Sequence, residues 1–226
     1  MPTSPGREST TATTRTRVPR RPPEVRRAQI LTAARELIAE RGLAATSVRE
    51  IAVAAGVSTG TVTYHFAHVG QILQAVLRAE VPLFTEPIVA AARSAPDGRT
   101  ELGRIVDGML SPTQATSRHW SLWIDYWAAA VHDPELARWQ DEIYRWWRAE
   151  LARVVARGAA DRSLTALEPV EEAAAVDELV ALMDGVVVQH FPAGPARGPA
   201  QARAAVHAFV ERRWGAGSAP RGGEAT

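Results

Sequence analysis

The sequence predicts an all-α fold, and three observations support that class. Apolar residues recur with a helical period in the first half, where Ile30, Ala34, Leu37 and Ile38 share one face. From Val81 onward one helical pattern follows another, with no alternating strand pattern. Capping residues, glycines and prolines separate these patterns at intervals typical of helix ends. We therefore expect a chain built entirely from helices.

The first expected helix covers about residues 24–41 and ends at Gly42. Two short helices should follow within residues 47–66. Ser47 and Glu50 have the spacing of a capping box, which begins a helix. Gly56 can adopt the left-handed conformation of a helix end, and Ser58 can cap the next helix. In that helix Val62 and Phe66 lie one turn apart and should face inward.

The remaining helices follow from similar signals. His68 is a candidate cap for a linker helix, and Pro82 should open a separate one that ends near Arg93. Asp133-Pro134-Glu135 is a strong helix start, and Gly158 should lie just past the end of that helix. The other expected helices cover about residues 99–110, 116–131, 169–191 and 200–214, with a loop at 193–199.

Composition excludes several classes of function. The chain has no cysteine, which removes disulfides, thiolate zinc sites and cysteine nucleophiles. We find no nucleophile–base set, metal-ligand cluster or phosphate loop, so we expect no enzyme, cofactor or metal. No apolar run reaches membrane-spanning length and the N-terminus is polar, so we expect a cytoplasmic protein without membrane contact.

Charge is unevenly distributed along the chain. Residues 1–78 hold eleven arginines and five glutamates, whereas the remainder holds fifteen arginines and twenty acidic residues. A positive first half suits a phosphate-rich partner. Residues 1–22 and 215–226 should be disordered tails, around a first domain at 23–78 and a second at 79–214. The arginine-rich first tail is either a solvated segment or a basic arm for DNA.

Ala52, Gly56 and Val62 have the Ala-x3-Gly-x5-Val spacing of a helix-turn-helix core. Around them, the run from Arg27 to Leu77 resembles the N-terminal domain of the tetracycline-repressor (TetR) family. It includes Thr46-Ser-Val-Arg-Glu-Ile-Ala, Ala55-Gly-Val-Ser and Gly60-Thr-Val-Thr-Tyr-His-Phe. The second half resembles the family in architecture, and Asp184-Gly185 is most similar to its betaine-regulator (BetI-like) branch. The resemblance implies a three-helix DNA-binding domain, a linker helix and a helical ligand-binding and dimerisation domain.

With Val62 and Phe66 inward, Gly60 and Tyr64 should point outward from the recognition helix, flanked by two threonines. This helix contains no Arg, Lys, Asn or Gln, so we expect it to contact thymine methyls and phosphates. Arg49 is the nearest long hydrogen-bond donor and could reach a base or a phosphate. The family's usual Ser-Lys at the linker is replaced by His68 and Val69, which puts that phosphate contact in doubt. The predicted DNA-contacting residues are Ser47, Arg49, Thr59, Gly60, Thr61, Thr63, Tyr64 and His65. The alternatives are that Ser47 is only a cap, Tyr64 only packs, and His65 lies at the edge of the core.

Tryptophans form helical stripes within residues 120–131 and 136–154. These stripes either line a cavity for a small hydrophobic or cationic ligand, as the resemblance implies, or pack as ordinary core. Glu150 falls inside the second stripe and should meet an arginine of the chain or a basic group of a ligand. Asp125 lies opposite the first stripe and should be solvated. The predicted ligand-binding residues are Trp120, Trp123, Trp127, Trp146, Trp147 and Glu150.

The expected helix at 170–191 is apolar on both sides, with Ala181, Gly185 and Val188 on the second side. It should pair with the helix at 200–214 across a two-fold axis to form a homodimer. Two recognition helices one DNA turn apart would bind a palindromic operator, and a ligand that changes their spacing would release it. The alternative is a helix-turn-helix regulator without a small-molecule effector, controlled by a protein partner or constitutive.

Overall fold

The computed structural model describes residues 22–191 and 198–215, and all the regular structure within these ranges is α-helical. The predicted all-α fold is confirmed. The predicted tails and the loop at 193–199 lie almost wholly outside the described ranges. In these ranges the helices are α1 (Pro23–Arg41), α2 (Val48–Ala54), α3 (Thr59–His65), α4 (Val69–Ala92), α5 (Gly98–Met109), α6 (Gln114–Ala130), α7 (Pro134–Ala160), α8 (Pro169–His190) and α9 (Pro199–Trp214).

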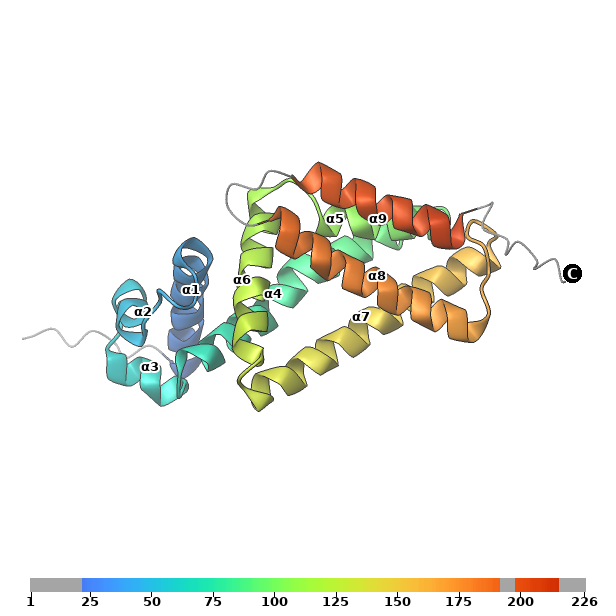
Figure 1. Ribbon diagram of the computed structural model, residues 1–226. Coiled ribbons are helices and arrows are strands. Elements are labelled where there is room, and N and C mark those ends of the chain that lie inside the picture. Colours follow the sequence, from blue (N-terminus) through green and yellow to red (C-terminus); the bar gives the residue numbers. More distant parts are fainter. Residues whose placement is uncertain (1–21, 192–197, 216–226) are drawn as a thin grey trace, which may run out of the picture.

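The first three helices form a small unit, which Figure 1 shows at the left, and α4 runs from it into a larger body made by α5 to α9. The predicted caps of this unit are confirmed. Ser47 Oγ accepts from the Glu50 N–H at 3.3 Å, and Glu50 Oε2 accepts from the Ser47 N–H at 2.9 Å. Gly56 has φ +65°, and Ser58 Oγ accepts from the Thr61 N–H at 3.1 Å. These caps satisfy backbone groups that such short helices would otherwise leave unpaired.

The core of the small unit comes from one face of each helix. Ile30 and Ile38 of α1 are buried, together with Ile51 of α2. Val62 and Phe66 are buried as predicted, so the opposite side of α3 is left to solvent. Because α2 packs against both α1 and α3, the position of α3 follows that of α1 through α2.

The predicted helix start at Pro82 is wrong, because α4 continues through both Pro82 and Pro87. Each proline lacks an N–H, which removes one backbone hydrogen bond. Buried residues in both halves of α4, such as Leu73 and Val89, pack on either side of the prolines and hold the two halves in one helix. His68 caps its start, accepting from the Gln71 N–H at 3.4 Å. The expected domain boundary after residue 78 falls inside α4 and stays a prediction.

The predicted end of α7 near Arg157 is also wrong, since the helix continues to Ala160. Gly158 lies within it because α5 crosses at this point. A Cβ added to Gly98 would lie 2.3 Å from the Gly158 nitrogen. Gly98 therefore lets α5 approach the α7 backbone more closely than a larger residue would permit, whereas a Cβ on Gly158 would meet the Leu164 side chain at 2.5 Å.

Asp125 of α6 is not solvated as expected. It is half-buried, and its Oδ2 accepts from the Leu43 N–H at 2.8 Å. The helical wheel places Asp125 away from the tryptophans correctly, but that side of α6 faces the loop between α1 and α2. The larger body thus makes a direct polar contact with the small unit.

Candidate functional site

The outer side of α3 is the first candidate site. Tyr64 is 83% exposed, and Thr59, Gly60 and Thr63 are exposed around it, whereas Thr61 and His65 are partly covered. A Cβ added to Gly60 would meet only Ser58 Oγ, at 3.8 Å. Packing within the chain therefore does not require glycine here, and its small size is available to a partner that approaches closely.

The two threonine hydroxyls on this side make local hydrogen bonds. Thr63 Oγ1 donates to the Thr59 carbonyl at 3.2 Å, and Thr61 Oγ1 lies 2.9 Å from Ser58 Oγ. A hydroxyl has one donor and two acceptor sites, so Thr63 can still accept from a base edge but must give up its present bond to donate to one. A threonine methyl group can contact thymine without any such change, which suits a helix without long polar readers.

A groove of about 510 Å³ separates α3 from the start of α1, and Arg26 is one of its lining residues together with Tyr64 and His65. Sequence reasoning missed Arg26, because its place in the first helix says nothing about how close α1 comes to α3. Ser47 is occupied as a cap, and Arg49 is exposed on α2. The surface therefore carries an arginine on each of the two helices next to α3.

A cavity in the larger body is the second candidate site. Four of the predicted tryptophans meet there, from α6 and α7, with the Trp120 and Trp127 rings 6.4 Å apart and the Trp123 and Trp127 rings 6.3 Å apart. Two adjoining cavities of about 30 Å³ each lie among them. Each has room for about two waters. The predicted tryptophans that line this space are Trp120, Trp123, Trp127 and Trp147.

Polar groups at the cavity were not predicted as ligand contacts. Tyr144 donates its hydroxyl to Asp184 Oδ2 at 2.6 Å, and both residues line the cavity. Burial raises the pKa of Asp184 to about 6. Asp184 makes no ion pair within the described part of the chain, and Arg148, which lies over the Tyr144 ring, pairs with Asp177 instead. The sequence signal for Asp184 was an acid next to Met183 in an apolar helix.

Two predicted ligand-binding residues lie away from the cavity. Glu150 is buried, but its carboxylate accepts from Arg153 at 2.8 Å and from Arg93 at 3.1 Å. These hydrogen bonds, that of Arg153 first, lower the pKa of Glu150. The alternative in which an arginine of the chain pairs with Glu150 is therefore correct. Trp146 is 37% exposed and packs edge-on against Trp147 at 5.1 Å, outside the cavity.

Within the described ranges, His, Asp and Glu side chains form no group of three or more that could hold a metal ion. No helix in these same ranges is long and apolar enough to cross a membrane.

Comparison with known families gives two matches. Residues 30–76 match the family described as "Bacterial regulatory proteins, tetR family". Residues 98–215 match the family described as "BetI-type transcriptional repressor, C-terminal". The HTH-type transcriptional regulator BetI of Burkholderia lata is 31% identical over 195 residues, covering 83% of this chain and 93% of that protein. The regulator of the same name from Stenotrophomonas maltophilia is 36% identical over 117 residues, covering 51% of this chain and 60% of that protein.

Solved structures are similar over most of the chain. A crystal structure of a regulator from Saccharomonospora viridis in complex with choline has a TM-score of 0.76 and 26% identity, covering 84% of this chain and 98% of that one. A TetR transcription regulator from Haloarcula marismortui has a TM-score of 0.71 at 16% identity, covering 84% and 99% of the two chains. The second likeness supports the fold alone.

The raised pKa of Asp184 predicts how stability depends on pH. The folded chain holds this proton more tightly than the unfolded chain, so the group's contribution to stability is lost as pH rises from about 4 to about 6. Asp184→Asn should raise the free energy of unfolding by about 3 kcal/mol at pH 8 and leave it unchanged below the unfolded pKa. Urea unfolding at both pH values measures this. Asp141→Asn, on the exposed side of α7, is the control, and equal effects of both substitutions at pH 8 would contradict the assignment.

Proposed function

The chain belongs to the tetR family of bacterial regulatory proteins, and we propose that it is a dimeric repressor that binds a palindromic operator and releases it when an organic cation enters the tryptophan cavity. It is a helix-turn-helix transcriptional regulator with a BetI-type C-terminal region, and its relatives are regulators rather than enzymes. The dimer, the operator and the ligand are the proposed parts. Each is supported by a separate feature of the molecule.

The exposed side of α3 supports major-groove binding. Gly60 lets the start of α3 approach the bases, and Thr61 and Thr63 offer methyl groups to thymine. Tyr64 and Arg26 flank this side and would bind phosphates, which fix position without reading sequence. Arg49 of α2 is the other long donor. The proposed contact surface also includes Ser47, Thr59 and His65. Ser47 lies at the start of α2, where it and the backbone N–H groups of the first turn would bind a phosphate.

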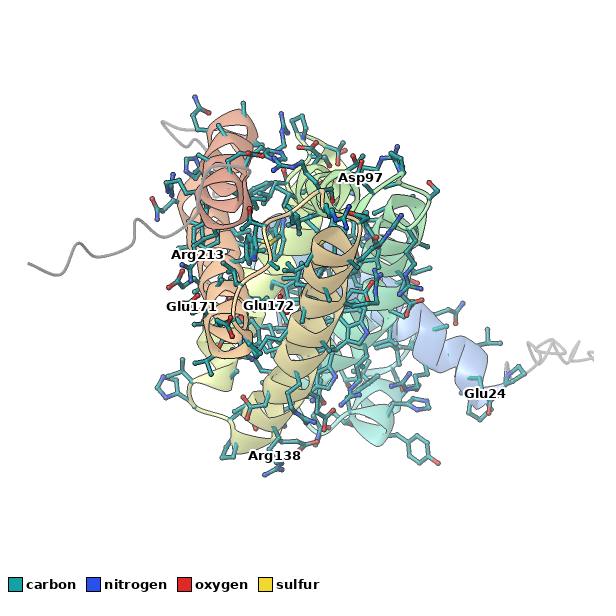
Figure 2. The ribbon with its side chains drawn as sticks, turned by 90° about the vertical axis from the view of Figure 1, so that its right-hand side faces the viewer. Glu24, Asp97, Arg138, Glu171, Glu172 and Arg213 are labelled. Atoms are coloured by element: carbon teal, nitrogen blue, oxygen red, sulfur yellow. The ribbon has the colours of Figure 1, made fainter. Side chains whose placement is uncertain are left out.

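The uncovered sides of α8 and α9 support a dimer. Val188 is 51% exposed, Ala181 is exposed, and a Cβ added to Gly185 would meet nothing within 4 Å. On α9 the exposed alanines are Ala200, Ala204, Ala205 and Ala208. Figure 2 shows α8 and α9 side by side at one edge of the body. Small residues on two adjacent helices let the same pair from a second copy pack closely in a four-helix interface.

One observation carries the ligand part of the proposal: the Asp184 carboxylate borders a tryptophan cavity and has no ion-pair partner in the described part of the chain. Aromatic faces attract cations, and a quaternary ammonium gains most because it is weakly hydrated. A bound cation would also balance the negative charge of the Asp184 carboxylate. The 26% identical Saccharomonospora regulator was crystallised with choline, so choline is the first ligand to test.

The cavity volume favours a second candidate function. At about 30 Å³ each, the two spaces cannot hold choline without movement of their walls. A regulator without a small-molecule effector would have such a closed core. Ligand titration separates the two candidates.

Choline should quench the tryptophan fluorescence of the wild-type chain. Asp184→Asn should weaken choline binding by about tenfold, because it removes the charge opposite the cation. The neutral isostere 3,3-dimethyl-1-butanol is the matched ligand control and should bind both proteins equally weakly. Absence of choline binding at millimolar concentration would favour the effector-free regulator. If the isostere bound the wild-type chain as tightly as choline does, recognition of the positive charge would be excluded.

Tyr64 and Arg26 should contribute to DNA affinity independently of sequence. We expect Tyr64→Ala to weaken binding by about tenfold on every duplex tested, and Arg26→Ala also to reduce the salt slope of the affinity by about 1. Duplexes selected from a random pool, titrated at several salt concentrations, measure both quantities. Val53→Ala, on the exposed side of α2, is the control. If Tyr64→Ala bound DNA with undiminished affinity, Tyr64 would not be part of the DNA interface.

Val188→Glu should convert the dimer to a monomer, because it places a charge in the proposed apolar interface. Sedimentation velocity measures the change, and DNA affinity should fall at the same time. Val131→Glu is the control, since Val131 is equally apolar and 76% exposed but lies at the end of α6. A wild-type chain that sediments as a monomer, or that binds a single non-palindromic half-site, would contradict the dimer.

A further inference from the structure

Helix α6 contacts the cavity on one side and the small N-terminal unit on the other. His119 and Trp120 line the cavity. On the opposite side Asp125 accepts from the Leu43 N–H at 2.8 Å, and Arg118 lies 3.5 Å from Glu36 of α1. A change in the cavity wall therefore reaches the DNA-reading unit through one helix.

Glu80 of α4 lies at the centre of a second connection. It is 3% exposed, and its carboxylate is held by Arg35 of α1, from Nε to Oε2 at 2.6 Å and from Nη2 to Oε1 at 3.0 Å. A two-point guanidinium–carboxylate contact is strong and fixes the orientation of both groups. Because the carboxylate is buried, loss of the arginine would leave a costly unpaired charge. This pair therefore tethers α1 to α4.

His119 lies between this pair and the cavity. It is 1% exposed, and burial, with Arg35 nearby, lowers its pKa to about 3, so the ring is neutral. Its ring is stacked on Phe84 at 4.0 Å and lies edge-on to Trp120 at 5.1 Å. Its Nδ1 makes no hydrogen bond within the described residues and lies 3.9 Å from Glu80 Oε1. That separation is about 1 Å longer than an ordinary N–H···O hydrogen bond.

We propose that a ligand in the cavity moves the His119 ring onto Glu80, where Nδ1–H donates to Oε1, shares that oxygen with Arg35 Nη2 and so shifts and weakens the tether between α1 and α4. The tight cavity supports this movement, because a cation among the tryptophans must displace a neighbouring ring. The hydrogen bond compensates a buried nitrogen that now has none in the described structure. A weakened Arg35 contact lets α1 shift, and α3 follows because α2 packs against both α1 and α3. The inference rests on the proposed ligand function and names the residues that transmit it.

The ligand arm of the test measures the ratio of DNA affinities without and with saturating choline. Glu80→Gln should retain choline binding by tryptophan fluorescence, within about threefold of the wild type, while the DNA ratio falls below about a third of the wild-type value. Glu86→Gln, an exposed glutamate on the same helix, is the matched control and should keep the full ratio. An unchanged ratio in Glu80→Gln would overturn the proposal. Loss of choline binding would also overturn it, since Glu80 would then act on the ligand directly.

A second arm needs no ligand. His119→Gln places an amide donor on a flexible arm beside Glu80, and should weaken DNA binding by about threefold or more in the ligand-free protein. In the Glu80→Gln background the same substitution should have no further effect, because the tether is already lost. Additive effects of the two substitutions would overturn the relay. If choline fails to bind the wild type, the proposed ligand is wrong, and this arm still decides whether His119 and Glu80 are coupled.

Discussion

The packing of α1 against α4 and α6 is the constraint on which the rest of the structure depends. Two seven-residue helices, α2 and α3, are too short to hold their own orientation and take it from α1. The helix α1 is held in turn by the buried Glu80 and by the backbone contact of Asp125 with Leu43. The orientation of α3 is therefore set by the packing of α1 on α4 and α6 together with these polar contacts.

Local sequence signals were sufficient for the small unit. The capping box at Ser47, the left-handed Gly56 and the inward Val62 each depend on neighbours within one or two turns, so spacing alone predicts them. The same reasoning was wrong at Pro82 and Gly158. There the outcome depends on contacts between helices distant in sequence, which hold α4 together and bring α5 against α7.

The candidate sites divide in the same way. Helical periodicity predicts that Trp120, Trp123 and Trp127 share one side of α6, and all three line the cavity. It could not show that Asp184 of α8 faces them, nor that Arg93 reaches Glu150 from another helix. A helical wheel gives the direction of a side chain, but the identity of its partner depends on tertiary packing.

The small size of the cavity sets a condition on the proposed regulation by a ligand. A ligand shifts the equilibrium between two conformations only if it binds one of them more tightly than the other. A space of about 30 Å³, bordered by His119 and the carboxylate of Asp184, admits an organic cation only if the walls move. In the proposed mechanism the ligand prefers the displaced state, and its differential affinity shifts α1. The tight packing of the cavity would then be the physical basis for coupling between ligand and DNA.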